Sequence, residues 1–296
     1  MRHSSRAQEA LGGRVAVLGI ECANPLLVAS GPLTDTVQQI GKLLAWGAGG
    51  VVTKTIFAGS EPAIREQFVR YGAGALNSTM YSHRPLAAWL DDVAEMRRRG
   101  WPVIVSIFAD DPHGLGTLAS RVVAAGAQAL ELGIACPNDG SQQRNAPQLV
   151  ARYTECVRSV VEVPIAVKLA AHRDFVECAR AACSAGADMI SLSDALPAVA
   201  MDSERSVMRF GGPVGYSGPP IKPLVLNAIH ELRTAGINVP LFGIGGVASA
   251  SDVIEYLLAG AVAVQVLTTL MLNHPSTLAT LVHGLASLPF ASSFAK

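Results

Sequence analysis

The sequence predicts an α/β protein, a (β/α)8 barrel formed as one domain by residues 1–296. Three observations lead to this fold class. One short segment recurs four times, short apolar strands number eight along the chain, and helical patterns separate them. Strands that alternate with helices pair in parallel. Eight such units in one domain favour a closed barrel over an open doubly wound sheet.

The recurring segment joins a helix to a strand. In each copy a glycine ends a helical pattern, a small residue follows, and a short apolar strand begins. The glycines are Gly47, Gly126, Gly186 and Gly260. Because the offset from glycine to strand end is the same in each copy, we expect one residue from each at a single rim of the sheet. Those residues, seven positions after the glycines, are Lys54, Gly133, Ser193 and Leu267.

The remaining strands follow a proline or glycine break. They are expected at Leu26–Ser30, Val103–Ile107, Ile165–Leu169 and Leu241–Ile244. Helical patterns occupy, among others, Leu86–Arg99, Ala146–Val161 and Ser251–Leu258. Two further short strands, Val15–Leu18 and Ile20–Cys22, predict a hairpin that plugs the bottom of the barrel.

Three of the connections that follow strands are long, at 55–85, 134–147 and 194–224. In a barrel of this type the chemistry lies on the loops after the strands. Long loops in a compact domain are usually lids or binding segments. We therefore expect the binding site to be built largely from these three connections.

Composition narrows the class of protein. Lys plus Arg and Asp plus Glu both number 23, so the formal net charge is zero and no nucleic-acid or anionic-membrane partner is predicted. The five cysteines contain no CxxC pair, so neither a zinc nor an iron–sulfur site is predicted. Scattered free thiols fit a reducing cytoplasm. Neither a signal peptide nor a membrane span is expected.

Two strand ends predict a phosphate site. Gly245 and Gly246 follow the seventh strand and lead into an N-cap cluster at 249–252, while Thr268 and Thr269 follow the eighth strand. Glycine amides, threonine hydroxyls and a helix N-terminus at these strands form the usual phosphate pocket of such barrels. The alternative is that the two glycines only turn the chain.

Two lysines end buried strands, Lys54 and Lys168. Burying an unpaired ammonium group is costly, so a purely solvated role is not expected. Opposite a redox flavin, either lysine stabilises the negative charge that reduction leaves on the ring. A Schiff-base aldolase is the rival reading, and the spacing alone leaves both open.

Seven short motifs, in this order and at these strand ends, resemble the dihydroorotate dehydrogenase family and its relative, the pyrimidine-oxidising domain of dihydropyrimidine dehydrogenase. The resemblance covers nearly the whole barrel. The motifs are Asn24-Pro25 with Ala29-Ser30-Gly31, Val52-Thr53-Lys54-Thr55, Leu76-Asn77-Ser78, Cys136-Pro137-Asn138, Val167-Lys168-Leu169, Tyr216-Ser217-Gly218-Pro219-Pro220-Ile221-Lys222-Pro223 and Gly243-Ile244-Gly245-Gly246-Val247.

The resemblance implies FMN as cofactor and a homodimer, and leaves the electron acceptor unknown. It implies that Cys136, as in the cytosolic class, takes a proton from one carbon while hydride leaves the neighbouring carbon for the flavin. Lys54 and Lys168 would share in catalysis. The implied FMN contacts are Ala29, Ser30, Gly31, Thr53, Lys54, Lys168, Gly218, Gly245, Gly246, Thr268 and Thr269; the implied substrate contacts are Asn77, Asn138, Ser193 and Asp194.

The chain departs from the family pattern in the substrate pocket. Gly133 stands where an asparagine is expected, and Ser193-Asp194 replaces an Asn-Thr or Asn-Ser pair. Lost hydrogen-bonding groups change specificity strongly, and the carboxylate of Asp194 would repel that of orotate. A related substrate with a C=C bond beside a carbonyl is one alternative. A flavin-free phosphate-binding lyase or aldolase and a flavin barrel without turnover are two more.

Overall fold

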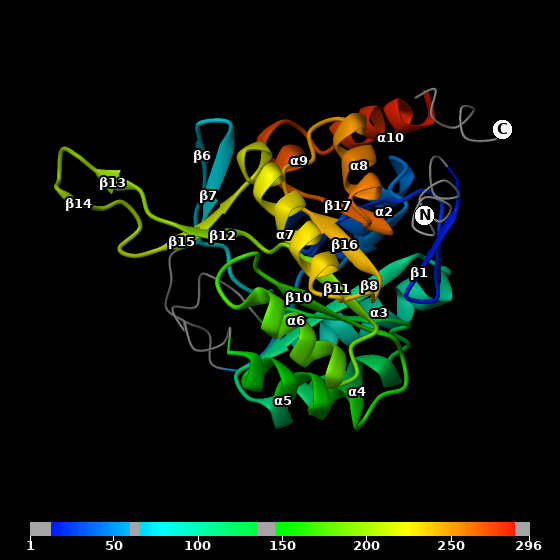
Figure 1. Cartoon of the computed structure of the whole chain (residues 1–296). Helices are drawn as coiled ribbons and strands as arrows, with labels where there is room; N and C mark the ends of the chain where they lie inside the picture. The colour runs from blue at the N-terminus through cyan, green and yellow to red at the C-terminus, as the bar shows by residue number, and fades with distance from the viewer. Residues whose placement is uncertain (1–12, 60–65, 135–145, 288–296) are drawn as a thin grey trace.

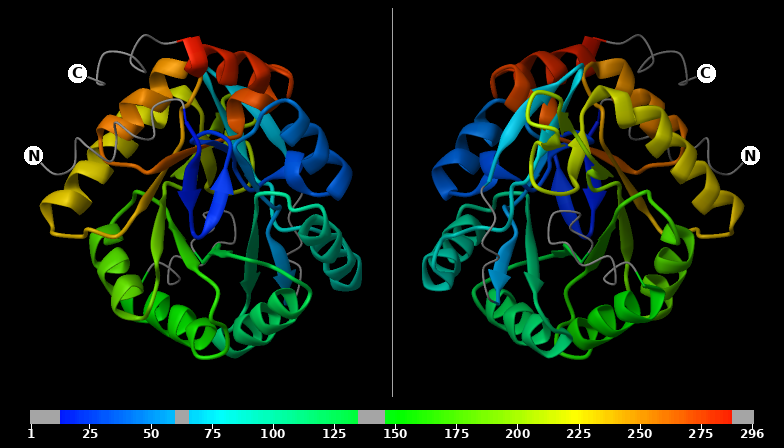
Figure 2. Two further views of the ribbon diagram at one scale, coloured as in Figure 1. Left: turned by 90° about the vertical axis from the view of Figure 1, so that its right-hand side faces the viewer. Right: turned by 90° about the vertical axis from the view of Figure 1, so that its left-hand side faces the viewer.

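The computed structural model describes residues 13–59, 66–134 and 146–287. Eight parallel strands close into a barrel, as predicted, because the first and last members of the run, β4 and β8, also pair with each other. Figure 2 shows the ring of strands enclosed by helices. In chain order the barrel strands are β3 (Leu26–Val28), β4 (Gly50–Val52), β8 (Val103–Ala109), β9 (Leu130–Leu132), β10 (Ile165–Leu169), β11 (Met189–Leu192), β16 (Leu241–Ile244) and β17 (Ala263–Val266).

The helices form the outer layer (Figure 2). The helices expected at 86–99, 146–161 and 251–258 are present and shift by at most three residues at either end. Pro147 occupies the first turn of its helix, where a missing N–H costs nothing. The helices are α2 (Val37–Ala45), α3 (Leu86–Arg98), α4 (Pro112–Ala124), α5 (Pro147–Arg158), α6 (Phe175–Ser184), α7 (Lys222–Thr234), α8 (Ala250–Leu258), α9 (Thr268–Leu272) and α10 (Thr277–Ser287).

The four repeated glycines end helices as the sequence predicts. Gly47, Gly126, Gly186 and Gly260 have φ angles of 95°, 115°, 98° and 105°. This left-handed region is open to glycine and strained for other residues. Each glycine therefore lets the chain leave its helix and enter the next barrel strand within a few residues, which sets the common register of the strand ends.

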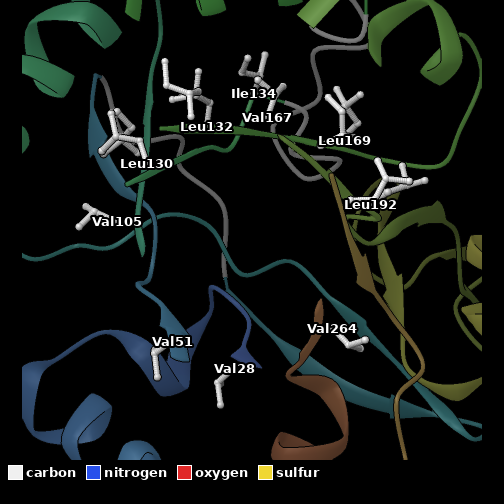
Figure 3. Close-up of a cluster of buried hydrophobic side chains, with 14 of the residues drawn as sticks. Val28, Val51, Val105, Leu130, Leu132, Ile134, Val167, Leu169, Leu192 and Val264 are labelled. Atoms are coloured by element: carbon white, nitrogen blue, oxygen red, sulfur yellow. The ribbon is translucent and has the colours of Figure 1, made fainter. Parts of the chain in front are cut away.

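Two apolar layers stabilise the barrel. Side chains that point outward from the strands, such as Val167 and Leu169 of β10, pack under the helices (Figure 3). The alternate residue Ala166 points inward and packs with Phe242. The inner layer is closed by the predicted hairpin of β1 (Val15–Val17) and β2 (Ile20–Cys22), whose Val17 belongs to the same cluster. Figure 2 shows this hairpin across the opening of the ring.

The long connections carry strands that the sequence did not reveal. A four-stranded antiparallel sheet in the order β12-β15-β7-β6 joins the connection after β4 to the connection after β11 (Figure 1). In the connection after β9, residues 135–145 lie outside the described residues. The added elements are η1 (Pro32–Thr34), β5 (Ile56–Ala58), β6 (Phe68–Tyr71), β7 (Gly74–Asn77), β12 (Leu196–Ala198), β13 (Met201–Asp202), β14 (Val207–Met208), β15 (Val214–Ser217) and η4 (Pro219–Ile221).

None of the helices in the described part of the chain is long and apolar enough to cross a lipid bilayer.

Shortening one core side chain tests the packing. Leu130 is fully buried between the barrel and the helices. We expect Leu130→Ala to lower the free energy of unfolding by about 3 kcal/mol. The substitution removes the buried methyl groups, and the surrounding side chains lose those contacts and leave a cavity. Leu224→Ala, at a side chain 56% exposed, should cost less than about 0.5 kcal/mol. Urea unfolding measures both; equal losses would contradict this packing.

Candidate functional site

A pocket opens at the carboxyl ends of the barrel strands. Its wall includes residues from all four repeated segments, Lys54, Gly133, Ser193 and Leu267, which confirms that they share one rim. The sequence-predicted site residues that line this pocket are Ala29, Ser30, Gly31, Lys54, Asn77, Lys168, Ser193, Asp194, Gly245, Gly246, Thr268 and Thr269.

Two of the predicted residues, Thr53 and Gly218, do not line the pocket, and two more are not described by the structure. Thr53 is fully buried behind the pocket wall, where its hydroxyl accepts a hydrogen bond from the backbone N–H of Ser106 at 2.9 Å. Gly218 also lies outside the lining, and a side chain there would meet Thr268. Of the two neighbours that follow β4, Lys54 lines the pocket and Thr53 does not. Cys136 and Asn138 lie outside the described residues.

The end of β3 shapes one wall of the pocket. The hydroxyl of Ser30 lies 3.2 Å from that of Thr55, which lies 2.9 Å from the Ser106 hydroxyl. Beside it, a Cβ atom on Gly31 would come within 2.3 Å of the Leu267 side chain. A larger residue at this position would require the Leu267 side chain to move.

The two lysines predicted from the strand ends both reach the pocket. The exposed fractions of Lys54 and Lys168 are 6% and 8%. The ammonium nitrogen of Lys168 lies 3.7 Å from Asp194 Oδ1 and 4.0 Å from Glu131 Oε1. Lys168 therefore stands between two carboxylates, one in the pocket wall and one beneath it.

Glu131 is the centre of a polar cluster inside the barrel that the sequence analysis missed. Its Oε2 atom accepts hydrogen bonds from the Ser191 hydroxyl at 2.7 Å and from Gln265 Nε2 at 3.1 Å. All three side chains are fully buried. Among the described residues, Oε1 accepts no hydrogen bond and instead faces Lys168. A charged residue inside an otherwise apolar strand was the available signal, since such residues are seldom buried unless paired.

The connection after β11 is fixed to the end of β10. The backbone N–H of Asp194 donates to the Leu169 carbonyl at 2.9 Å, and the Ser193 hydroxyl accepts from the Ala171 N–H at 2.8 Å. The side chain of Asp194 remains 24% exposed. Both predicted residues thus lie at the pocket, with Asp194 held close to Lys168.

Asn77 ends β7 and links the two strand-bearing connections. Its Nδ2 donates to the Gly215 carbonyl at 3.3 Å, and its Oδ1 accepts from the Thr79 hydroxyl at 3.3 Å. The following residues complete this wall, where the ring of Tyr81 stacks on Phe57 with centroids 4.4 Å apart. Asn77 and Tyr81 give the pocket a polar group beside a flat apolar one.

The four residues predicted to bind phosphate lie together in the pocket wall. Gly245 and Gly246 have φ angles of 120° and 74°, and a Cβ atom on Gly246 would meet Lys222 at 2.6 Å. The Thr268 hydroxyl donates to Ser217 Oγ at 2.9 Å, and the Thr269 hydroxyl donates to the Val247 carbonyl. These bonds tie the ends of β16 and β17 to the β15 connection.

The N-cap cluster at 249–252 serves its own helix. Asp252 Oδ2 accepts from the N–H groups of Ala248 and Ser249 at 2.9 and 2.7 Å. Burial raises the pKa of Asp252, but hydrogen bonds from Lys222, Ala248 and Ser249 outweigh burial and hold the pKa below its ordinary value. Asp252 thus fixes the chain at the start of α8, and Gly245, Gly246, Thr268 and Thr269 are the phosphate candidates that line the pocket on this side.

The described cysteines lie away from the pocket. Burial, with a smaller contribution from Glu21, raises the pKa of Cys22 to about 12. Burial likewise raises the pKa of Cys178 to about 11. Both thiols stay protonated at neutral pH, so neither is suited to act as a base.

Comparison with known proteins gives one consistent result. The family model described as dihydroorotate dehydrogenase matches residues 14–288. A dihydroorotate dehydrogenase B (NAD(+)), catalytic subunit, from Pyrococcus furiosus is 34% identical over 283 residues, 92% of each chain. Proteins of the same name from Methanothermobacter thermautotrophicus and Desulforudis audaxviator are 30% identical over 290 residues and 33% identical over 270 residues. These alignments cover 94% of both chains in the first case, and 88% of this chain and 87% of the relative in the second.

Removing Glu131 tests the buried cluster. We expect Glu131→Ala to lower the free energy of unfolding by about 3–5 kcal/mol, because Lys168 loses its buried counter-charge and two donors lose their acceptor. Glu177→Ala, which removes a 61% exposed carboxylate paired with Arg180, should cost less than about 0.5 kcal/mol. Equal losses in denaturant unfolding would show that the cluster stabilises nothing.

Proposed function

Because the chain belongs to the dihydroorotate dehydrogenase family, we propose that it binds FMN at the barrel mouth and exchanges hydride with a CH–CH unit beside a carbonyl group. Members of this family are flavoenzymes, oxidoreductases that act on CH–CH groups. Family membership therefore favours a flavin enzyme over the flavin-free lyase or aldolase that the lysines alone left open.

One observation of the structure supports FMN most directly. Two nearly buried lysines and the glycine and threonine residues after β16 and β17 line the same pocket. A ligand that carries a phosphate and becomes anionic on reduction matches both halves of this wall. The residues present therefore fit a phosphorylated flavin.

The proposed contacts divide along the pocket. Ala29, Ser30, Gly31, Lys54 and Lys168 would hold the ring and the ribityl chain, and Gly245, Gly246, Thr268 and Thr269 would hold the phosphate. Thr53 and Gly218 would support this wall from behind, since neither lines it. Bound FMN supplies the hydride-accepting centre; the lysines supply fixed positive charge beside it.

We assign the proton transfer to Cys136. The cysteine takes a proton from one carbon of the substrate while the neighbouring carbon loses hydride, and in the reductive direction it returns the proton. Asn77, Asn138, Ser193 and Asp194 would orient the substrate ring. The burial of Cys22 and Cys178 leaves them unsuited to this role.

The electron acceptor and assembly are part of the proposal. The relatives are named as catalytic subunits of NAD(+)-dependent enzymes, which supports a partner chain that passes electrons to NAD(+). We also propose a homodimer in a cytoplasmic setting. Sedimentation of the purified protein tests the dimer, and a monomer at micromolar concentration would contradict it.

Release of the cofactor tests the proposal. The purified protein should absorb near ~450 nm, the usual flavin region. Heat denaturation should then release a compound with the mass of FMN. A colourless protein that also takes up no added FMN would contradict the proposed function, and release of FAD would correct the cofactor.

Replacing Cys136 tests its assignment as base. The substrate is whichever of dihydroorotate and 5,6-dihydrouracil reduces the wild-type flavin faster. In Cys136→Ser we expect the rate of anaerobic flavin reduction by that ring to fall by about 10²–10⁴-fold at pH 7, because the hydroxyl is a weaker base. The flavin spectrum before mixing should not change. Cys156→Ser is the matched control and should keep the wild-type rate. An unchanged rate in Cys136→Ser would remove this residue from the mechanism.

A further inference from the structure

The carboxylate of Asp194 occupies a fixed place in the pocket. Its backbone N–H is bonded to the Leu169 carbonyl at 2.9 Å, and its backbone carbonyl accepts from the Ser193 hydroxyl at 2.6 Å. Oδ1 accepts from the Ala195 N–H at 2.8 Å. Among the described residues Oδ2 accepts no hydrogen bond. Asp194 therefore presents a negative acceptor to whatever enters.

Lys168 has a counter-charge other than Asp194. Glu131, fully buried, already stands 4.0 Å from the ammonium nitrogen on the barrel side. Charges interact more strongly in a buried setting than near water. The 24% exposed Asp194, at 3.7 Å on the pocket side, is thus a second carboxylate on one lysine.

The described charged groups of this site balance one another. Lys54, Lys168 and Asp194 are the charged residues of the described pocket wall, and Glu131 lies directly beneath. The two positive and two negative groups cancel before a ligand binds. These four described groups carry no excess positive charge to compensate Asp194 when an anionic substrate approaches, and like charges at close range weaken binding.

We propose that Asp194 is a specificity-determining residue that selects an uncharged ring. Its carboxylate accepts a hydrogen bond from a ring amide N–H and disfavours a ring that carries a carboxylate of its own. This inference rests on the proposed function, and it deepens it by assigning the substrate class as a neutral cyclic amide or imide of the dihydropyrimidine type.

A pair of product ligands isolates the effect. Orotate and uracil differ by one carboxylate, so their dissociation constants can be compared on the same protein by titration calorimetry without turnover. In Asp194→Asn we expect orotate to bind at least about tenfold more tightly than in the wild type. Uracil should change by less than about threefold, because it bears no charge.

Two further variants sharpen the comparison. Asp194→Ser removes the charge with a smaller side chain and should shift the orotate-to-uracil preference in the same direction. Asp202→Asn, on β13 of the same connection, makes the same change in total charge on the projecting β13–β14 hairpin (Figure 1). It should leave both dissociation constants within twofold.

An orotate-to-uracil preference that stays within twofold in both Asp194 variants would overturn the inference. Wild-type protein that binds orotate more tightly than uracil would overturn it as well. A protein without flavin would instead contradict the proposed function, and calorimetry would still decide the role of Asp194. The two failures are therefore distinguishable.

Discussion

Placing the ammonium group of Lys168 inside a barrel mouth requires a matching carboxylate, and Glu131 supplies it from within the barrel. The hydrogen bond from Gln265 to Glu131 joins β17 to β9, two strands that are not neighbours in the sheet. It forms only because the sheet closes on itself. Ring closure, the buried carboxylate and the position of Lys168 are thus one physical constraint, on which the chemistry of the site depends.

The same arrangement explains why the site lies where it does. Helix-ending glycines such as Gly186 and Gly260 give the strands a common register, so their last residues meet at one mouth. The antiparallel sheet of β6, β7, β12 and β15 then encloses that mouth from one side (Figure 1). A ligand in this pocket is held by rigid strand ends and by an added sheet, a setting that suits precise positioning.

The barrel could be predicted from the sequence because its signals are local. Each glycine, proline and apolar run acts within about ten residues, and Lys54 and Lys168 are found simply by where their strands end. The Glu131 cluster could not be found this way, since Ser191, Gln265 and Lys168 reach Glu131 from other strands. The direction of a side chain could not be predicted from the sequence either: Thr53 and Lys54 are adjacent, and only Lys54 lines the pocket.

The short strands of the long connections were not predicted from the sequence, for a related reason. Strands of three or four residues, such as β12 and β15, carry little periodicity. The pairing of β15 with β12 on one side and β7 on the other is set by contacts across the barrel mouth. The cluster at 249–252 was correctly predicted as a cap, whereas the N–H groups of Ala248 and Ser249 prove to be bonded to Asp252. Local sequence therefore predicts where a helix begins more readily than which group accepts hydrogen bonds from the N–H groups at that point.

The central claim is that this pocket holds a flavin that accepts hydride from a CH–CH substrate. The most direct measurement is anaerobic titration of the purified holoprotein with dihydroorotate and, in parallel, with 5,6-dihydrouracil, followed by flavin absorbance. The predicted result is that at least one of the two rings bleaches the flavin completely at about one equivalent per flavin. Bound flavin that remains oxidised with both rings would contradict the claim.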